Sequence, residues 1–431
     1  MPFEMNAATP RRIAVIGGGI AGMAAAHMLA ADHAVVLFEA EKRLGGHART
    51  IMAGKRGDQP VDTGFIVFNH VNYPGLTALF EKLEVPTTPS TMSFGCSIAN
   101  GALEYGLANL DTVFAQRRNL ARPAFLRMIR DILHFNKHAL QVEQNPALTV
   151  RELLADLGTG AWFRDYYLTP FSGAIWSTPV GGMLDFPAAA LVRFFKNHGL
   201  LGTNDQHQWH TVTGGSVEYV RRLQAAMVKR DVDLRLGSLV GSVHRVPGGV
   251  IVKALGVAAE VFDDVVFACH SDQALDLLAD ATVRERTALS AIRYQSNEAV
   301  LHSDASLMPK RRKVWSSWVY SEPAGAGRER IDLTYWMNSL QPIPLDDPLF
   351  VTLNARRDIP DHLVHDATTF YHPVFDVAAL RAQAAIRAAN GTHRTWFCGA
   401  WMKNGFHEDG FASAMEVAMA IGARTQRALA A

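Results

Sequence analysis

The sequence predicts an α/β protein in which a Rossmann-type dinucleotide-binding domain is interwoven with an α+β substrate domain. The first observation is a strand, a glycine-rich loop, a helix and a second strand within residues 12–39. The second is a series of short apolar segments between residues 272 and 384, several of them alternating with polar residues as in a sheet with one covered face. The third is the lack of a repeat or a flexible linker, which favours interwoven domains. A chain of 431 residues has room for two or three domains.

Composition and charge exclude several classes of protein. Hydrophobic residues make up 48% of the chain and charged residues 19%, which excludes a disordered or collagen-like protein. The 42 basic and 41 acidic residues nearly cancel, so no global field would attract nucleic acid. Cys96, Cys269 and Cys398 form no CxxC pair, so we expect neither a disulfide framework nor a bound metal. A reducing cytoplasm fits this cysteine content.

Residues 13–31 are apolar except for His27 and follow Arg11 and Arg12. By hydropathy alone they resemble a membrane span or a twin-arginine export signal. The run divides, however, into a β-branched strand (12–16), a glycine-rich loop (17–22) and an alanine-rich helix, and a second strand follows at 34–38. Its four glycines would also weaken a spanning helix. We therefore predict a dinucleotide-binding unit.

The glycine spacing in this unit has a physical reason at each position. Gly17 permits a tight turn, Gly19 lets the backbone approach a pyrophosphate, and Gly22 lets the helix pack against the strand. Glu39 lies 22 residues after Gly17, where a carboxylate accepts hydrogen bonds from ribose hydroxyls and repels a 2′-phosphate. The neighbouring residues expected to contact the same ligand are Ile20, Ala21 and Ala40.

A second glycine pair follows directly. Residues 43–50 resemble the R-x-G-G-x-x-x-[ST] segment of FAD enzymes in the flavin-containing amine oxidase and phytoene desaturase superfamily. Gly45 and Gly46 would let this loop approach the pyrophosphate, and Arg43 would offset its charge. The superfamily more often has arginine where this chain has His47. The resemblance implies FAD as the cofactor and an amine-oxidase-like two-domain fold.

The resemblance extends over nearly the whole chain and implies further cofactor contacts. Residues 208–271 resemble the second FAD-binding segment, and in the last segment, from residue 394, the helix that follows the strand and loop would point its N-terminus at the flavin. The residues assigned to the cofactor on this basis are Gly64, Val240, Ala268, Gly399, Ala400, Gly410 and Phe411. Gly64 is equally well an ordinary strand start. No cysteine lies in the loop before the last helix, so we expect FAD to be bound non-covalently.

The same comparison divides the chain into two discontinuous domains. The FAD-binding domain is expected from residues 1–75, 208–271 and 385–431. The substrate domain is expected from residues 76–207 and 272–384, with a helical part at 105–200 and a sheet part at 272–384.

Five further segments resemble a bacterial branch of NAD/FAD-binding oxidoreductases linked with methylated and furan fatty acid formation. They are residues 172–177, 194–199, 372–376, 399–401 and 405–411. This resemblance implies hydride removal from an apolar small molecule or lipid, such as a methylated acyl chain. Dioxygen or another acceptor would then reoxidise the cofactor. The alternatives are an amine oxidase acting on a small or lipophilic amine and a lipid-binding escort protein without redox chemistry.

Five residues are candidates for the catalytic site. Phe406 would form a wall over the flavin, and His407 and Glu408 would move protons. Trp176 and Tyr371 would line the pocket. For each, a structural role in the core or as a cap is the competing interpretation. Nine aromatic residues between positions 162 and 195 suit either a hydrophobic cavity or a helical core.

Two basic stretches remain, at residues 111–140 and 310–313. In the first, apolar residues interleave with arginines. Such a surface could contact an anionic membrane peripherally. A solvated helical face is the competing interpretation.

Overall fold

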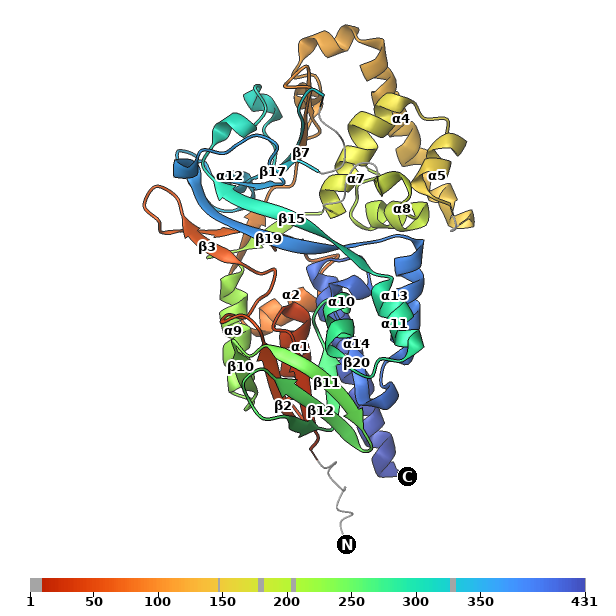
Figure 1. Ribbon diagram of the computed structural model, residues 1–431. Coiled ribbons are helices and arrows are strands. Elements are labelled where there is room, and N and C mark those ends of the chain that lie inside the picture. The colour runs from red at the N-terminus through yellow and green to blue at the C-terminus, as the bar shows by residue number, and fades with distance from the viewer. Residues whose placement is uncertain (1–9, 146–147, 177–181, 203–206, 326–330, 431) are drawn as a thin grey trace.

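The computed structural model describes residues 10–430 except 146–147, 177–181, 203–206 and 326–330. Figure 1 shows two lobes, a lower one that holds the first strands and the C-terminal helix and an upper one that holds the helices between residues 123 and 197. The long strands β15 (Arg293–His302) and β19 (Val364–Val374) run between them. The fold is the mixed α/β architecture predicted from the sequence.

The lower lobe is built on a five-stranded parallel sheet with the order β10-β2-β1-β14-β20. Ile13, Ala14 and Val15 are fully buried because helices or a small sheet cover both faces. The strands are β1 (Arg12–Ile16), β2 (Ala34–Glu39), β10 (Asp233–Leu236), β14 (Asp264–Phe267) and β20 (Thr395–Phe397). One face is covered by α1 (Ile20–Leu29), α2 (Pro74–Lys82), α9 (Val217–Val228) and α14 (His407–Ala430).

Residues 12–39 therefore form the strand, loop, helix and strand expected from the sequence, which excludes the membrane-span interpretation of this run. Within the described ranges, no helix is both long and apolar enough to cross a membrane.

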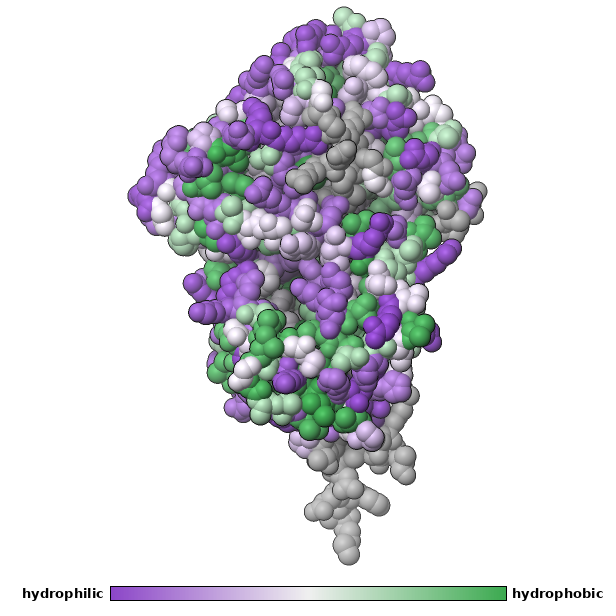
Figure 2. Space-filling model, viewed as in Figure 1, coloured by the Kyte–Doolittle hydropathy of each residue, from purple (hydrophilic) through white to green (hydrophobic). Residues whose placement is uncertain are grey.

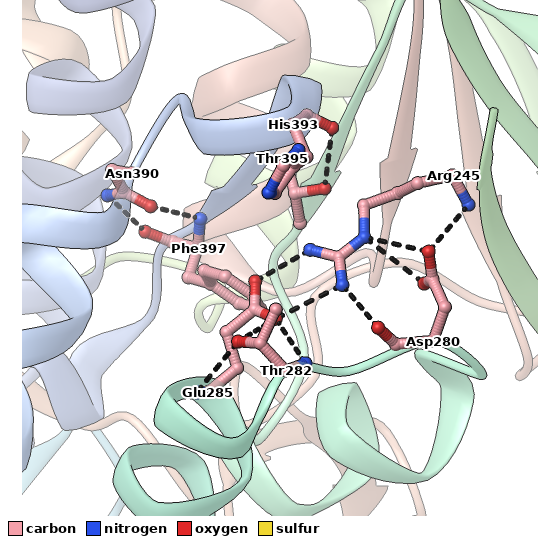
Figure 3. Close-up of polar contacts among 8 residues, drawn as sticks. All are labelled: Arg245, Asp280, Thr282, Glu285, Asn390, His393, Thr395 and Phe397. Atoms are coloured by element: carbon pink, nitrogen blue, oxygen red, sulfur yellow. Dashed lines mark hydrogen bonds and ion pairs between the residues drawn. The ribbon is translucent and has the colours of Figure 1, made fainter. Parts of the chain in front are cut away.

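The other face of the sheet is covered by a three-stranded antiparallel sheet and three helices. The sheet is β11 (Val240–Val246), β12 (Gly249–Ala254) and β13 (Glu260–Phe262). The helices are α10 (Ser271–Leu277), α11 (Val283–Ser290) and α13 (Val377–Ala389). Figure 3 shows how β11 is fixed to α11: Arg245 pairs with Asp280 and Glu285, and Thr282 caps the helix through the same glutamate.

The apolar residues of 232–240 predict a single strand of a meander, and this prediction is wrong. These residues contain the end of one sheet and the start of another. β10 pairs with β2 in the parallel sheet, the chain turns at Gly237 (φ +65°), and β11 begins at Val240. The alternation of apolar residues breaks only at Gly237 and Ser238, and this short turn signal marks the change of sheet.

The upper lobe contains a seven-stranded sheet with the order β19-β15-β18-β17-β16-β7-β8. Its other strands are β7 (Phe94–Ile98), β8 (Leu103–Gly106), β16 (Trp318–Glu322), β17 (Leu333–Trp336) and β18 (Phe350–Leu353). The helices packed beside it include α3 (Leu110–Val113), α4 (Pro123–His138), α5 (Val150–Asp156), α7 (Thr169–Trp176) and α8 (Ala188–Asn197).

The packing suggests domain boundaries other than those expected from the sequence. Helices α10, α11 and α13 lie within or next to the segment assigned to the substrate domain, yet they share a core with the parallel sheet. Helix α2 shares the core on the opposite face. We propose that the first segment of the dinucleotide-binding domain ends at residue 83 and that its other two segments are residues 209–292 and 377–430.

A buried carboxylate joins the two lobes. Asp62 ends β4 (Gln59–Asp62), which pairs with β3 (Thr50–Ala53). It accepts hydrogen bonds from the Thr50 hydroxyl (2.6 Å), from the backbone N–H and hydroxyl of Ser216 (2.9 and 2.7 Å) and from the Gln341 amide (3.0 Å). Gln341 follows the short helix α12 (Met337–Leu340) of the upper lobe and accepts in return from the Asp62 N–H.

Candidate active site

The glycine-rich loop after β1 leaves an open cradle at the start of α1. Gly17 has φ +110°, and a Cβ atom at Gly22 would lie 1.8 Å from the Gly17 carbonyl oxygen. A Cβ atom at Gly19, by contrast, would meet no atom within 4 Å. Gly19 is the N-cap of α1 and offers no side chain to the helix. The N-terminus of α1 therefore faces free space, as binding of a phosphate requires.

The second glycine pair packs directly on the first. Gly45 N–H donates to the Gly18 carbonyl at 2.8 Å, and the Arg43 guanidinium donates to the Gly46 carbonyl at 3.0 Å. Arg43 therefore shapes this loop in addition to carrying a positive charge beside it. The Glu39 carboxylate ends β2 and accepts from the backbone N–H groups of Gly18 and Glu41.

One cavity of about 1790 Å³ begins at these loops and continues between the lobes. Small-molecule sites have volumes of roughly 300–1,000 Å³, so this cavity has room for a dinucleotide and a second molecule. The predicted cofactor residues that line it are Gly17, Gly19, Ile20, Ala21, Glu39, Ala40, Arg43, Gly45, Gly46, Gly64, Val240, Ala268, Gly399 and Ala400. The cradle and these lining residues fit a bound dinucleotide.

Four of the predicted site residues lie outside the cavity wall. Gly22 packs against the Gly17 carbonyl, and Gly410 packs against Ile20 at the start of α1. The buried Phe411 ring contacts the start of α2. Glu408 accepts from the Gly75 and Leu76 N–H groups at 3.0 and 2.8 Å, so it caps α2. This geometry favours a structural role for Glu408 over proton transfer.

An aromatic wall closes one side of the cavity. Phe406 stacks on Phe194, with ring centroids 4.9 Å apart, and meets Trp176 edge-on at 6.3 Å. The Trp176 N–H donates to the Asn404 carbonyl, which fixes the indole beside the loop that precedes α14. Of the nine aromatic residues between 162 and 195, those that line the cavity are Tyr167, Phe171, Trp176 and Phe194. Tyr371, on β19, also lines it and is 52% exposed.

His407 is the polar residue at the start of α14 that faces the cavity. Its Nε2 lies 2.6 Å from the Tyr219 hydroxyl, and its ring stacks on Phe65 at 4.0 Å. Burial lowers the pKa of His407 to about 3 and raises that of Tyr219. The imidazole is therefore neutral at physiological pH and its orientation is fixed.

Four further histidines in the cavity wall were not among the predicted site residues: His198, and a cluster formed by His47, His270 and His372. His47 stacks on Phe370 at 4.9 Å and lies 6.2 Å from His270 and 5.5 Å from His372, centroid to centroid. Burial lowers the pKa of His47 and His270 to about 4 and that of His372 to about 3. His47, His270 and His372 lie far apart in the sequence, and only His47, in the second glycine segment, and His372, beside Tyr371, had a local signal for their place.

These neutral histidines predict that the protein loses stability in acid. A histidine whose pKa is lower in the folded state than in the unfolded state stabilises the fold above pH 6.5 and ceases to do so as the pH falls towards 4. For His47 the shift from 6.5 to about 4 corresponds to about 3 kcal/mol. We expect the free energy of unfolding, measured in urea, to fall steeply between pH 6.5 and 4.

Replacing His47 by phenylalanine should lower by one the number of protons that the protein takes up on unfolding between pH 6.5 and 4. The free energy of unfolding should therefore fall less steeply in this range. The same replacement at the exposed His362 should leave this pH dependence unchanged. A free energy of unfolding that stays constant between pH 6.5 and 4 would contradict the assignment of neutral buried histidines.

The upper lobe contributes a wall without acidic residues. The acidic residues that line the cavity, Glu39, Glu41 and Asp276, all belong to the lower lobe. In the wall built by the upper lobe, none of the described residues is acidic. The indole N–H groups of Trp318 and Trp336 in this wall are buried without a hydrogen-bond partner among the described residues. These N–H groups have no accessible surface and do not face the cavity, so this part of the cavity suits an apolar ligand.

Comparisons with known proteins agree with this arrangement. The family described as flavin containing amine oxidoreductase matches residues 20–305, about two thirds of the chain. No curated protein sequence matches the chain.

Solved structures with low sequence identity share the fold. A CLA-producing fatty acid isomerase from P. acnes superposes with a TM-score of 0.69 at 15% identity, covering 95% of this chain and 98% of that one. Cyclohexylamine oxidase from Brevibacterium oxydans gives 0.69 at 16% identity, covering 97% and 100%. Putrescine oxidase bound to putrescine gives 0.68 at 15% identity, covering 96% and 99%.

Proposed function

Since this chain belongs to the family of flavin-containing amine oxidoreductases and is an FAD-dependent oxidoreductase, we propose that it removes a hydride from an apolar substrate, a fatty acyl chain. The observation that supports this substrate is the upper-lobe wall of the cavity, whose described residues are aromatic, aliphatic or uncharged polar apart from two histidines held neutral by burial. Burying a charged group without a partner there would cost several kcal/mol, whereas burying a methylene group contributes about 0.8 kcal/mol of stabilisation.

We propose that different residues of the cavity bind different parts of the cofactor. The cradle at Gly19 and Gly46 holds the pyrophosphate, and Glu39 accepts hydrogen bonds from ribose hydroxyls. When bound, FAD supplies a hydride acceptor. The N-terminus of α14, beside Gly399 and Ala400, adds positive potential at the cavity. We expect FAD to be bound non-covalently.

The aromatic wall would orient the substrate. Phe406 and Trp176 would hold the acyl chain against the opposite wall of the cavity and exclude water. A fixed position of the acyl chain matters because hydride transfer requires the reacting atoms to approach to roughly 3–3.5 Å. Dehydrogenation also releases a proton, and the neutral imidazole of His407, fixed by Tyr219 and Phe65, would accept it.

The competing functions are less well supported by this cavity. An amine substrate arrives as an ammonium ion, and the upper-lobe wall offers it no carboxylate among the described residues. A protein of the same fold is a fatty acid isomerase, so the fold can accommodate an acyl chain. An escort protein without redox chemistry would not need the open cradle at Gly19.

The experiment is anaerobic mixing of the purified protein with candidate substrates while the flavin spectrum is recorded. We expect a yellow protein whose oxidised flavin band bleaches with methyl-branched acyl lipids and persists with cyclohexylamine and putrescine. Bleaching by the amines alone would contradict the proposal, and a colourless protein that cannot be loaded with FAD would favour the escort function.

A further inference from the structure

The cavity reaches solvent between α3 and α4. Leu110 and Leu133 both line the cavity, and they are 77% and 55% exposed. A side chain that borders both the cavity and solvent marks the rim of an opening. The other lining residues of these two helices are Val113, Ile129, Ile132 and Asn136.

Exposed leucines continue from this rim along α4. Leu126 and Leu133 are two turns apart on one face of the helix, and Leu140 lies two further turns along, in the 3₁₀ segment after α4. Leu126 is 43% exposed and Leu140 is 36% exposed. The opposite face packs into the core through Phe125, Met128 and Phe135. The leucine stripe is therefore not needed to hold α4 in place.

The surface around the opening is strongly basic although the whole chain has a net charge of +1. Residues 101–140 and 310–313 contain ten lysines and arginines and three acidic residues. The acidic residues are all engaged: Glu104 pairs with Arg311, Asp111 with Arg117 and Lys313, and Asp131 with Arg130 and Arg127. Asp111 thereby joins the two basic stretches into one surface.

We propose that this surface, the α3–α4 rim, docks on an anionic lipid bilayer and lets an acyl chain enter the cavity from it. We define the rim as Leu110, Leu126, Leu133 and Leu140 with the basic residues of 117–137 and 310–313. The leucines enter the acyl boundary while the arginines and lysines contact lipid phosphates. The acyl chain then passes from the bilayer to the aromatic wall of the cavity without crossing water. This inference rests on the proposed acyl substrate.

A second exposed apolar patch provides a comparison. Figure 2 shows apolar residues gathered over β11 and β12 in the lower lobe. Its members Leu255, Val257 and Val261 are 54–61% exposed, but Glu260 and Asp263 lie beside them in the sequence. Residues 240–263 contain two basic residues, Arg245 and Lys253, and two acidic residues, Glu260 and Asp263, so this patch has no excess of positive charge to complement an anionic membrane.

The test is flotation of the FAD-loaded protein with vesicles of phosphatidylcholine, with and without phosphatidylglycerol. The variant Leu126→Glu/Lys137→Glu changes two exposed rim residues that do not line the cavity. Its matched control is Leu255→Glu/Lys253→Glu, which makes the same two replacements in the other patch.

We expect the wild type and the control to float with the phosphatidylglycerol vesicles only, and the rim variant to partition at least about tenfold less. Absence of flotation of the wild type at low salt, or equal loss in both variants, would overturn the proposal. Flavin bleaching by detergent-dispersed acyl lipid tests the proposed function separately, and it should be the same in all three proteins.

Discussion

Replacing Gly22 by alanine should weaken the binding of FAD. The added Cβ atom would lie 1.8 Å from the Gly17 carbonyl oxygen and 3.2 Å from the Ala268 side chain, so the loop must move. That movement changes the cradle in which the N-terminus of α1 meets the pyrophosphate. Overpacking of this kind costs about 1–3 kcal/mol, which corresponds to a roughly 5- to 150-fold weaker FAD affinity. Titration of the apoprotein with FAD, followed by flavin fluorescence, measures this change.

The matched control for this variant is Gly422→Ala. Gly422 also lies in a helix, and a Cβ atom there would meet nothing within 4 Å. Alanine at this position should leave FAD affinity unchanged and stabilise the helix by up to about 1 kcal/mol. Equal FAD affinity of the Gly22 variant and the wild type would show that the loop after β1 does not hold the cofactor.

Replacing Asp62 by alanine should strongly destabilise the folded protein. The carboxylate is fully buried and accepts hydrogen bonds from Thr50, Ser216 and Gln341, which come from three separate segments. Without it, the Ser216 N–H and the Gln341 amide remain buried and unpaired, which costs about 1–3 kcal/mol for each group. We expect a loss of about 3–5 kcal/mol in the free energy of unfolding, measured in urea.

Asp58→Ala is the control for this prediction. Asp58 lies in the turn before the same strand, and its exposed carboxylate pairs with Arg56 at 3.2 Å. An exposed ion pair contributes roughly 0–1 kcal/mol, so this variant should unfold at nearly the wild-type urea concentration. Similar stability losses in the two variants would contradict the role of Asp62 in joining the lobes.

The dinucleotide half of the site could be predicted because its signal is local. Gly17, Gly19 and Glu39 lie within 23 residues, and their spacing follows from the geometry of one strand, one turn and one helix. The second glycine pair lies close by and bonds to the first loop through Gly45. Few other folds place such residues at this spacing, so the sequence was sufficient.

The substrate half could not be predicted in the same way because its residues come together only through tertiary packing. His47, His270 and His372 are separated by more than 100 residues from one to the next, and no shared motif links the three. Glu408 looks like a candidate acid from its position, yet its partners are the N–H groups of α2, more than 300 residues earlier. Hydrogen bonds over such separations have no periodicity for a sequence pattern to reveal.

The central claim is that this protein dehydrogenates an acyl chain, and the mass of the product tests it most directly. Purified enzyme, a methyl-branched acyl lipid and dioxygen are incubated together, and the lipid is then analysed by mass spectrometry. The account predicts a product lighter than the substrate by two hydrogen atoms, formed only by the FAD-loaded protein. A lipid of unchanged mass, together with oxidation of an added amine, would contradict it.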